Sequence, residues 1–184
     1  MLLSKIKTVL RRKSKPASEL EYRLKNGMHI GKNCNLYSVD TIDGGWPWLI
    51  SMGNNVTIST NVTILAHDAS TNIVGCGTKL GRVKIGNNVF VGTGATILCD
   101  TKIGDNVVIG AGAVVCCDLE SDGVYVGIPA KRVCSIEQYR KKYEKLRAIR
   151  PDFSKTRAWN DWNNSTEEEK NKMLNELSDG VGFV

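Results

Sequence analysis

The sequence has 184 residues, 41% of them hydrophobic and 24% charged, which is an ordinary composition for one folded domain. This composition excludes an intrinsically disordered chain, and no stretch approaches the ~18 consecutive apolar residues of a membrane span. Residues 1–26 hold eight Lys/Arg and two Glu and so carry the whole net charge of +6. A basic arm on a neutral body does not predict a nucleic-acid-binding protein, and we expect no nucleic-acid partner.

Residues 1–27 are predicted to form a basic helical segment. In residues 1–15 the apolar side chains fall on one helical face and the basic ones on the other, a pattern typical of a helix at a membrane surface. Two interpretations stay open: peripheral contact with the anionic inner membrane surface, or a helix that packs on its own assembly. A second helix is expected after Ser18.

Residues 28–133 carry a repeat of six residues. Residues 85–102 and 103–120 are identical at nine of 18 positions, and large aliphatic residues recur six residues apart in three runs. The members of these runs are Ile30, Leu36, Ile42, Met52, Ile58, Ile64, Ile85, Val91, Ile97, Ile103, Ile109 and Val115. A period of six fits neither an amphipathic helix nor a strand of a simple sheet. It predicts an all-β, three-sided parallel coil in which each hexad gives one short strand and one turn.

Two segments interrupt the repeat. The six-residue repeat breaks after His67 and resumes at Ile85, so that residues 69–84 are expected to form a loop that projects from the coil. A loop of this length in a compact repeat is more often functional than not. Earlier, Trp46-Pro47-Trp48 interrupts the frame, and its aromatic faces are expected either to stack on a sugar or to pack at a subunit seam.

The repeat ends after Pro129, and residues 134–184 are predicted to be a helical extension. A capping box that begins at Ser135 predicts a helix to about Ile149. A second box at Thr166 predicts another helix to about Ser178.

Three features of the chain resemble the hexapeptide-repeat acyltransferases. They are the motif [I/V]-G-x-N-V-x-[I/V]-G-x-G-A, a His-Asp pair at the end of an earlier coil, and the closing segment Gly127–Lys131. The branch that the chain resembles is the maltose/galactoside O-acetyltransferase type, which includes enzymes that acetylate surface polysaccharides. The resemblance implies a left-handed parallel β-helix, although parallel crossovers are usually right-handed. It also implies a homotrimer with active sites between subunits, acetyl-CoA as co-substrate and no metal.

In the family that this chain resembles, the histidine at the place of His67 is the general base that takes the proton of the acceptor hydroxyl. An imidazole changes its protonation near neutral pH, which suits this task. We therefore expect direct transfer, with acceptor and acetyl-CoA bound together. A covalent route through a cysteine is the alternative, and it has less support because no cysteine neighbours a histidine in the sequence. The six cysteines are expected to be free thiols: Cys34, Cys76, Cys99, Cys116, Cys117 and Cys134.

The acceptor side is interpreted from carboxylates and aromatic residues. The resemblance places an acceptor-contacting carboxylate close to Asp43, and Asp43, Asp68 and Asp100 are also candidates to orient the base. Tyr37 stands where the family motif has an acceptor-binding asparagine, so we do not expect a galactoside pocket. The candidate substrate-binding residues are Asp43, Tyr37, Trp46, Trp48, Asp68 and Phe90.

The resemblance assigns the donor site to the late coils. Thr93 and Ala111 would contact the pantetheine arm of coenzyme A through backbone groups, and Lys131 would meet its phosphates. The family tends to have Thr-Lys where this chain has Cys116-Cys117, so that one phosphate partner is missing. Basic residues that could replace it are Lys79, Arg82 and Lys84. The candidate cofactor-binding residues are Thr93, Gly110, Ala111, Cys116, Cys117, Lys131 and Arg132.

The function expected from these observations is acetyl-CoA-dependent O-acetylation of a sugar hydroxyl, in a surface or capsular polysaccharide or its precursor. One alternative is N-acetylation of a nucleotide-linked amino sugar, and another is a non-catalytic β-helix scaffold. The metal lyase of this fold would need three histidine ligands, whereas His29 and His67 are the two histidines of the sequence, so we expect no metal. Free cysteines and the lack of a secretion signal predict a cytoplasmic location. Peripheral contact with the inner membrane face through residues 1–15 is compatible with this location.

Overall fold

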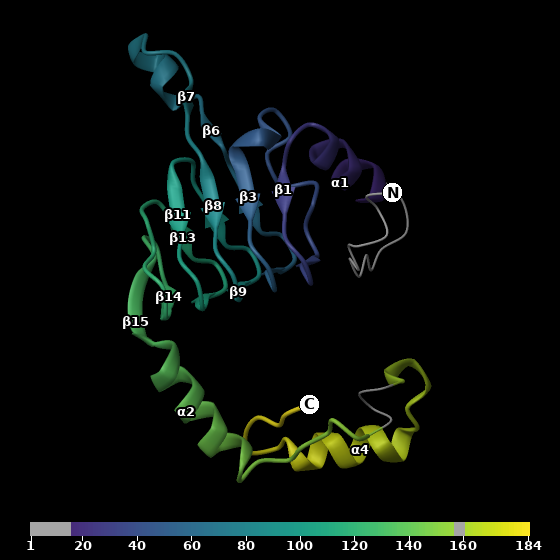
Figure 1. Ribbon diagram of the computed structural model, residues 1–184. Helices are drawn as coiled ribbons and strands as arrows, with labels where there is room; N and C mark the ends of the chain where they lie inside the picture. The colour runs from purple at the N-terminus through teal and green to yellow at the C-terminus, as the bar shows by residue number, and fades with distance from the viewer. Residues whose placement is uncertain (1–15, 157–160) are drawn as a thin grey trace. The chain divides into compact units, whose positions relative to one another are not determined.

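The computed structural model describes residues 16–156 and 161–184 (Figure 1). The chain divides into two compact units, Met1–Ile136 and Glu137–Val184, and each is described by itself. The amphipathic segment predicted for residues 1–15 lies outside the described residues. Within the described part of the chain, no helix is long and apolar enough to cross a membrane.

The first unit is a coil of short strands stacked on three faces (Figure 1). The first face consists of β1 (His29–Ile30), β3 (Ile50–Met52), β8 (Val83–Ile85) and β11 (Thr101–Ile103). The second consists of β5 (Thr63–Ile64), β10 (Thr96–Ile97) and β13 (Val114–Val115). The third consists of β2 (Asn35–Leu36), β4 (Thr57–Ile58), β9 (Val89–Val91), β12 (Val107–Ile109), β14 (Gly123–Val126) and β15 (Lys131–Ser135). Neighbouring strands on these faces are parallel except for the antiparallel pair β14–β15, and the predicted left-handed parallel β-helix is confirmed.

The core consists of the aliphatic residues that the repeat predicts. Ile64, Ile97 and Val115 are fully buried, and the register of β5, β10 and β13 places each directly above the next. Ile58 and Val91 are stacked in the same way between β4 and β9. Burying one such side chain contributes about 1.5–3 kcal/mol, so that the interior column stabilises the coil.

One corner of the coil, between the first and third faces, is a ladder of asparagines. Asn33, Asn55, Asn88 and Asn106 have φ between 55° and 58°, a left-handed conformation that asparagine tolerates better than branched residues. The side-chain amide of Asn55 donates to Asn88 at 2.8 Å, and Asn88 donates to Asn106 at 2.9 Å. Asn106 in turn donates to the carboxylate of Asp122 at 2.9 Å, where the ladder ends.

The N-terminal helix α1 (Pro16–Lys25) precedes the coil, and the 3-10 helix η2 (Pro47–Leu49) replaces a hexad within it. A proline at the first helical position starts η2, where its missing N–H costs nothing. Elements α1 and η2 contact each other, and a Cβ on Gly27 would lie 3.0 Å from Cβ of Trp48.

The insertion after His67 is an antiparallel hairpin that projects from the coil (Figure 1). It consists of β6 (His67–Asp68), the 3-10 helix η3 (Ser70–Val74) and β7 (Lys79–Leu80). The insertion is shorter than the expected residues 69–84 because β8 begins at Val83, whose side chain is fully buried. Lys84 is therefore an exposed residue of a coil strand.

The second unit contains α2 (Ile136–Arg147), whose first residue belongs to the coil unit, followed by η4 (Trp162–Asn164) and α4 (Glu167–Glu176). The predicted capping box of α4 is present: Thr166 accepts from the Glu169 backbone, and the Glu169 side chain accepts from the Thr166 backbone. Helix α2 ends two residues before the predicted Ile149. Strand β15 extends the last sheet of the coil to Ser135, past the predicted boundary at residue 133.

Candidate active site

His67 lies at the corner between the first and second faces, where the hairpin leaves the coil. The buried residues Ile64 and Ala66 fix the chain just before it. The chain returns beside the point where it left, because the Gly81 N–H donates to the Ala66 carbonyl at 3.0 Å. Position 81 needs glycine, since a Cβ there would lie 2.4 Å from the backbone nitrogen of Asp100. Asp100 therefore packs against Gly81, at the foot of the hairpin.

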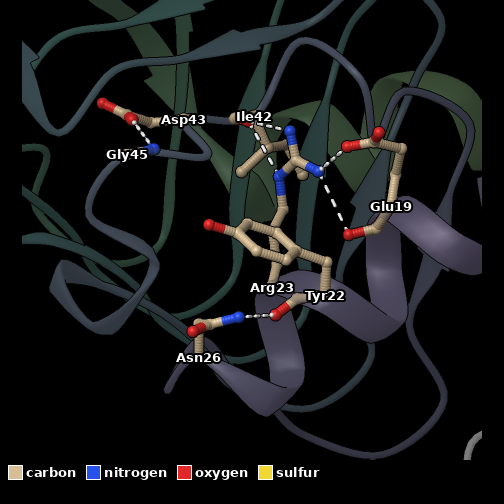
Figure 2. Close-up of polar contacts among 7 residues, drawn as sticks. All are labelled: Glu19, Tyr22, Arg23, Asn26, Ile42, Asp43 and Gly45. Atoms are coloured by element: carbon tan, nitrogen blue, oxygen red, sulfur yellow. Dashed lines mark hydrogen bonds and ion pairs between the residues drawn. The ribbon is translucent and has the colours of Figure 1, made fainter.

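The carboxylate of Asp43 holds the His67 ring. Its Oδ2 lies 2.5 Å from Nδ1 of His67 and accepts the Ala66 N–H at 2.9 Å. Its Oδ1 accepts the Gly45 N–H at 2.9 Å, a bond that Figure 2 shows. The Asp43 side chain is 2% exposed, and both of its oxygens contact protein groups, so that the carboxylate fixes the orientation of the His67 ring.

This contact decides what the imidazole can do. A carboxylate at Nδ1 favours the tautomer with the proton on that nitrogen, which leaves a lone pair on Nε2. The His67 side chain is 36% exposed, and Nε2 has no hydrogen-bond partner among residues 16–156 and 161–184. The Trp46 ring packs on the imidazole with centroids 4.7 Å apart and planes tilted by 51°. The arrangement has the geometry that a general base requires, in which a carboxylate orients the imidazole and leaves Nε2 available.

The pKa of Asp43 is lowered from its ordinary value. Burial of the carboxyl group alone would raise the pKa, but the hydrogen bond from His67 and the N–H groups of Gly45 and Ala66 outweigh it. The carboxylate is therefore ionised at neutral pH and can stabilise the positive charge of a protonated imidazole.

The other predicted acceptor residues have separate environments. Asp68 holds the base of the hairpin: it accepts the Ser70 N–H at 2.9 Å and lies 3.7 Å from Nζ of Lys79. The Ser70 N–H bond is the main cause of a lowered pKa at Asp68. Trp46 is half-buried against His67, whereas Trp48 is 59% exposed.

Tyr37 and Phe90 are exposed aromatic residues, Tyr37 beside the third face and Phe90 on it. Each is 46% exposed. The Tyr37 N–H donates to the Ile58 carbonyl, and Phe90 stands opposite Thr57 of β4. In the described chain, neither ring makes a ring contact with His67.

The predicted donor residues Thr93 and Ala111 lie at the third corner, between the second and third faces. Both are exposed and belong to adjacent coils, which the bond from the Gly112 N–H to the Thr93 carbonyl joins at 2.9 Å. Gly92 lets the coils approach, since a Cβ there would lie 2.5 Å from the Ala111 nitrogen. Gly110 packs similarly against Val126 of β14.

The remaining donor candidates lie near the end of the coil. Cys116 and Cys117 are exposed free thiols, and Lys131 is exposed on β15. Arg132 donates to the Asp122 carbonyl at 2.9 Å. Within the described residues, no hydrogen bond, ion pair or ring contact joins these groups to His67, which lies at a different corner of the coil from Thr93 and Ala111.

One further residue near the site was not predicted from the sequence. Arg23 of α1 is 4% exposed and donates to the backbone carbonyl of Ile42, next to Asp43. No motif could have indicated it, because its partner is a backbone group that every residue possesses.

Comparisons with known proteins agree with the repeated coil. The family model for the bacterial transferase hexapeptide, described as six repeats, matches residues 82–117. Protein CapG of Staphylococcus aureus is 42% identical over 123 residues, which cover 64% of this chain and 72% of CapG. The chain belongs to the hexapeptide-repeat acyltransferase family. The acyltransferase class predicted from the sequence is confirmed by this membership.

The chain is also similar in part to solved structures of acetyltransferases. A galactoside acetyltransferase in complex with coenzyme A has a TM-score of 0.52 and 31% identity, over 62% of this chain and 58% of that one. Soybean serine acetyltransferase is 34% identical over 58% of this chain, with a TM-score of 0.46. The chain spans 40% of the soybean enzyme and less than two thirds of the galactoside enzyme.

Proposed function

We propose that this hexapeptide-repeat protein transfers an acetyl group from acetyl-CoA to a hydroxyl group of a sugar, with His67 as the general base. The observation that carries the proposal is the contact of Nδ1 with Asp43, which leaves Nε2 free on a partly exposed ring. Membership of an acyltransferase family and the likeness to a galactoside acetyltransferase in complex with coenzyme A support the donor and the reaction.

The reaction proceeds by direct transfer. Nε2 of His67 removes the proton of the acceptor hydroxyl while its oxygen attacks the carbonyl carbon of the thioester. The C–S bond then breaks, and the leaving thiolate of coenzyme A takes the proton back from the imidazolium. Asp43 stabilises the imidazolium meanwhile and holds its Nδ1–H. The products are the sugar acetate and coenzyme A.

The complete site requires more than one copy of the chain. His67 lies at one corner of the coil, whereas Thr93 and Ala111 lie at another. A homotrimer in which the donor corner of one subunit faces the histidine corner of its neighbour would unite them, with Lys131 for the phosphates of coenzyme A. This arrangement explains why the donor residues are exposed in one copy.

Exposed aromatic residues favour a saccharide as the acceptor. Trp48, Tyr37 and Phe90 present apolar faces to solvent, and such faces suit the C–H surfaces of sugar rings. A surface or capsular polysaccharide, or a precursor of one, is the proposed acceptor.

The decisive experiment measures acetyl transfer from acetyl-CoA by mass spectrometry. The acceptor panel contains saccharides, nucleotide-linked amino sugars and serine. His67→Ala is expected to abolish the acetylated saccharide, whereas His29→Ala, which removes the other, exposed histidine, should retain it. Acetylation of amino groups alone would replace the proposal with N-acetyl transfer. A wild-type protein that does not bind coenzyme A would indicate a scaffold.

A further inference from the structure

Arg23 is a buried cation that the proposed reaction does not use directly. It lies on α1 with 4% of its surface exposed, and a buried charge is costly unless it is fully paired. Figure 2 shows its guanidinium between two partners. Nε and Nη2 donate to the Ile42 carbonyl at 2.9 and 2.6 Å, and Nη1 donates to the Glu19 carboxylate and carbonyl at 2.7 and 3.1 Å.

The carbonyl that Arg23 binds belongs to the peptide unit that leads into Asp43. The N–H of the same unit donates to the Ile64 carbonyl at 2.8 Å, so that the peptide plane is held at both ends. Ile42 is 1% exposed, and water cannot easily replace the guanidinium as the donor to its carbonyl. The orientation of this plane sets the direction in which the Asp43 side chain leaves the backbone.

We propose that Arg23 is a positioning residue for the Asp43–His67 pair. The proposal rests on the proposed function, because its consequence for rate requires His67 to be the base. Without the guanidinium, the Ile42 carbonyl is left unsatisfied and the peptide unit rotates toward another donor. The Asp43 carboxylate then moves away from Nδ1, and the imidazole is no longer held in one tautomer and orientation. Helix α1 thereby acts on His67 through the backbone of Ile42 and the side chain of Asp43.

Arginine suits this position for a geometric reason. Its planar fork places two N–H groups on one carbonyl and directs the others at Glu19, whereas a lysine ammonium is a single point of donation. Arg23→Lys keeps the charge and most of the aliphatic stem but loses the pair of N–H groups that donate to the Ile42 carbonyl. Arg23→Met removes the donors altogether.

The first test is spectroscopic and needs no substrate. Protein labelled with 15N-histidine contains two labelled residues, His29 and His67, and a Nδ1–H bound to a carboxylate gives a far-downfield proton resonance. We expect Arg23→Lys and Arg23→Met to shift or abolish the His67 resonance. The matched control is Arg140→Met, which removes an exposed arginine paired with Glu137 and Glu144, and it should leave the resonance unchanged.

The second test separates positioning from folding. We expect kcat to fall about 100-fold in Arg23→Met and about 10-fold in Arg23→Lys, as for a catalytic group displaced by about 1 Å, with the KM for acetyl-CoA unchanged. A folded Arg23→Lys protein with the wild-type resonance and kcat would overturn the proposal. If Arg23→Met does not fold, Arg23→Lys decides. If the wild type transfers no acetyl group to any acceptor, the proposed function fails while the resonance still tests the positioning role.

Discussion

Asp43 and His67 are 24 residues apart in the sequence, yet Oδ2 of one lies 2.5 Å from Nδ1 of the other. The stacking of successive coils brings them together. Ile42 forms a parallel bridge with Ile64, and the Asp43 N–H donates to the Ile64 carbonyl at 2.8 Å. The pair is therefore built on paired backbone, which gives it a fixed geometry before any ligand binds.

Asp43→Asn should lower kcat by about 100-fold or more, since an amide cannot stabilise the imidazolium or enforce its tautomer as a carboxylate does. Acetyl transfer to the best acceptor of the panel measures the effect. Asp179→Asn, which alters an exposed carboxylate paired with Arg150 in the second unit, is the control and should match the wild type. Equal rates in Asp43→Asn and wild type would contradict the role of Asp43.

The lowered pKa of Asp43 predicts a pH dependence of stability. A carboxyl group whose pKa is lower when folded than when unfolded stabilises the protein above the unfolded value of about 3.9. The contribution is lost as the pH falls through the folded value. The difference in unfolding free energy between wild type and Asp43→Asn, measured with urea, should be larger at pH 7 than at pH 3. A difference that grows toward acid would show that the sign is wrong.

Two isoleucines should differ sharply in their effect on stability. Ile97 is fully buried in the interior column, and Ile97→Ala should lower the free energy of unfolding by about 2–5 kcal/mol. Ile73 is 92% exposed in the hairpin, so Ile73→Ala should change it by less than about 0.5 kcal/mol. Urea unfolding of both variants checks the prediction, and a large loss in Ile73→Ala would mean that its side chain is covered in solution.

Gly81→Ala should destabilise the protein by about 1–3 kcal/mol, since the new Cβ would meet the Asp100 backbone at 2.4 Å. The strain falls at the foot of the hairpin, so acetyl transfer should decline as well. Ile73→Ala, a change at a 92% exposed position of the same hairpin, is the control for both measurements. An unchanged free energy of unfolding in Gly81→Ala would show that the backbone at Asp100 can move away from residue 81 without loss of stability.

Most of the coil was predictable from the sequence because its interior is one residue type repeated at a fixed interval. Ile58, Ile64 and Val91 were assigned to the core from this period and are fully buried. The break in the period also indicated His67. The end of the insertion was not predictable in the same way, because Val83 occupies a strand position that the period of six alone does not mark.

The contacts of the site were harder to predict. Asp43 was singled out, but its partner depends on which coils stack after the interruption that contains Trp46. Arg23 binds a backbone carbonyl, and because every residue has one, the residue type of the partner gives no indication of this contact. The sequence could therefore indicate residues whose side chains carry the chemistry of the site, such as Asp43 and His67. It could not indicate Arg23, whose partner is a backbone carbonyl.

The reversal of β15 has a consequence for how copies of the chain can associate. A stack of parallel strands is in principle endless, and an open edge invites another copy to continue it into a fibre. On the third face, the antiparallel β15 covers the edge of β14 and presents the positive charges of Lys131 and Arg132. Continuation of this face by a further parallel strand of another copy, beyond β14, is thus obstructed.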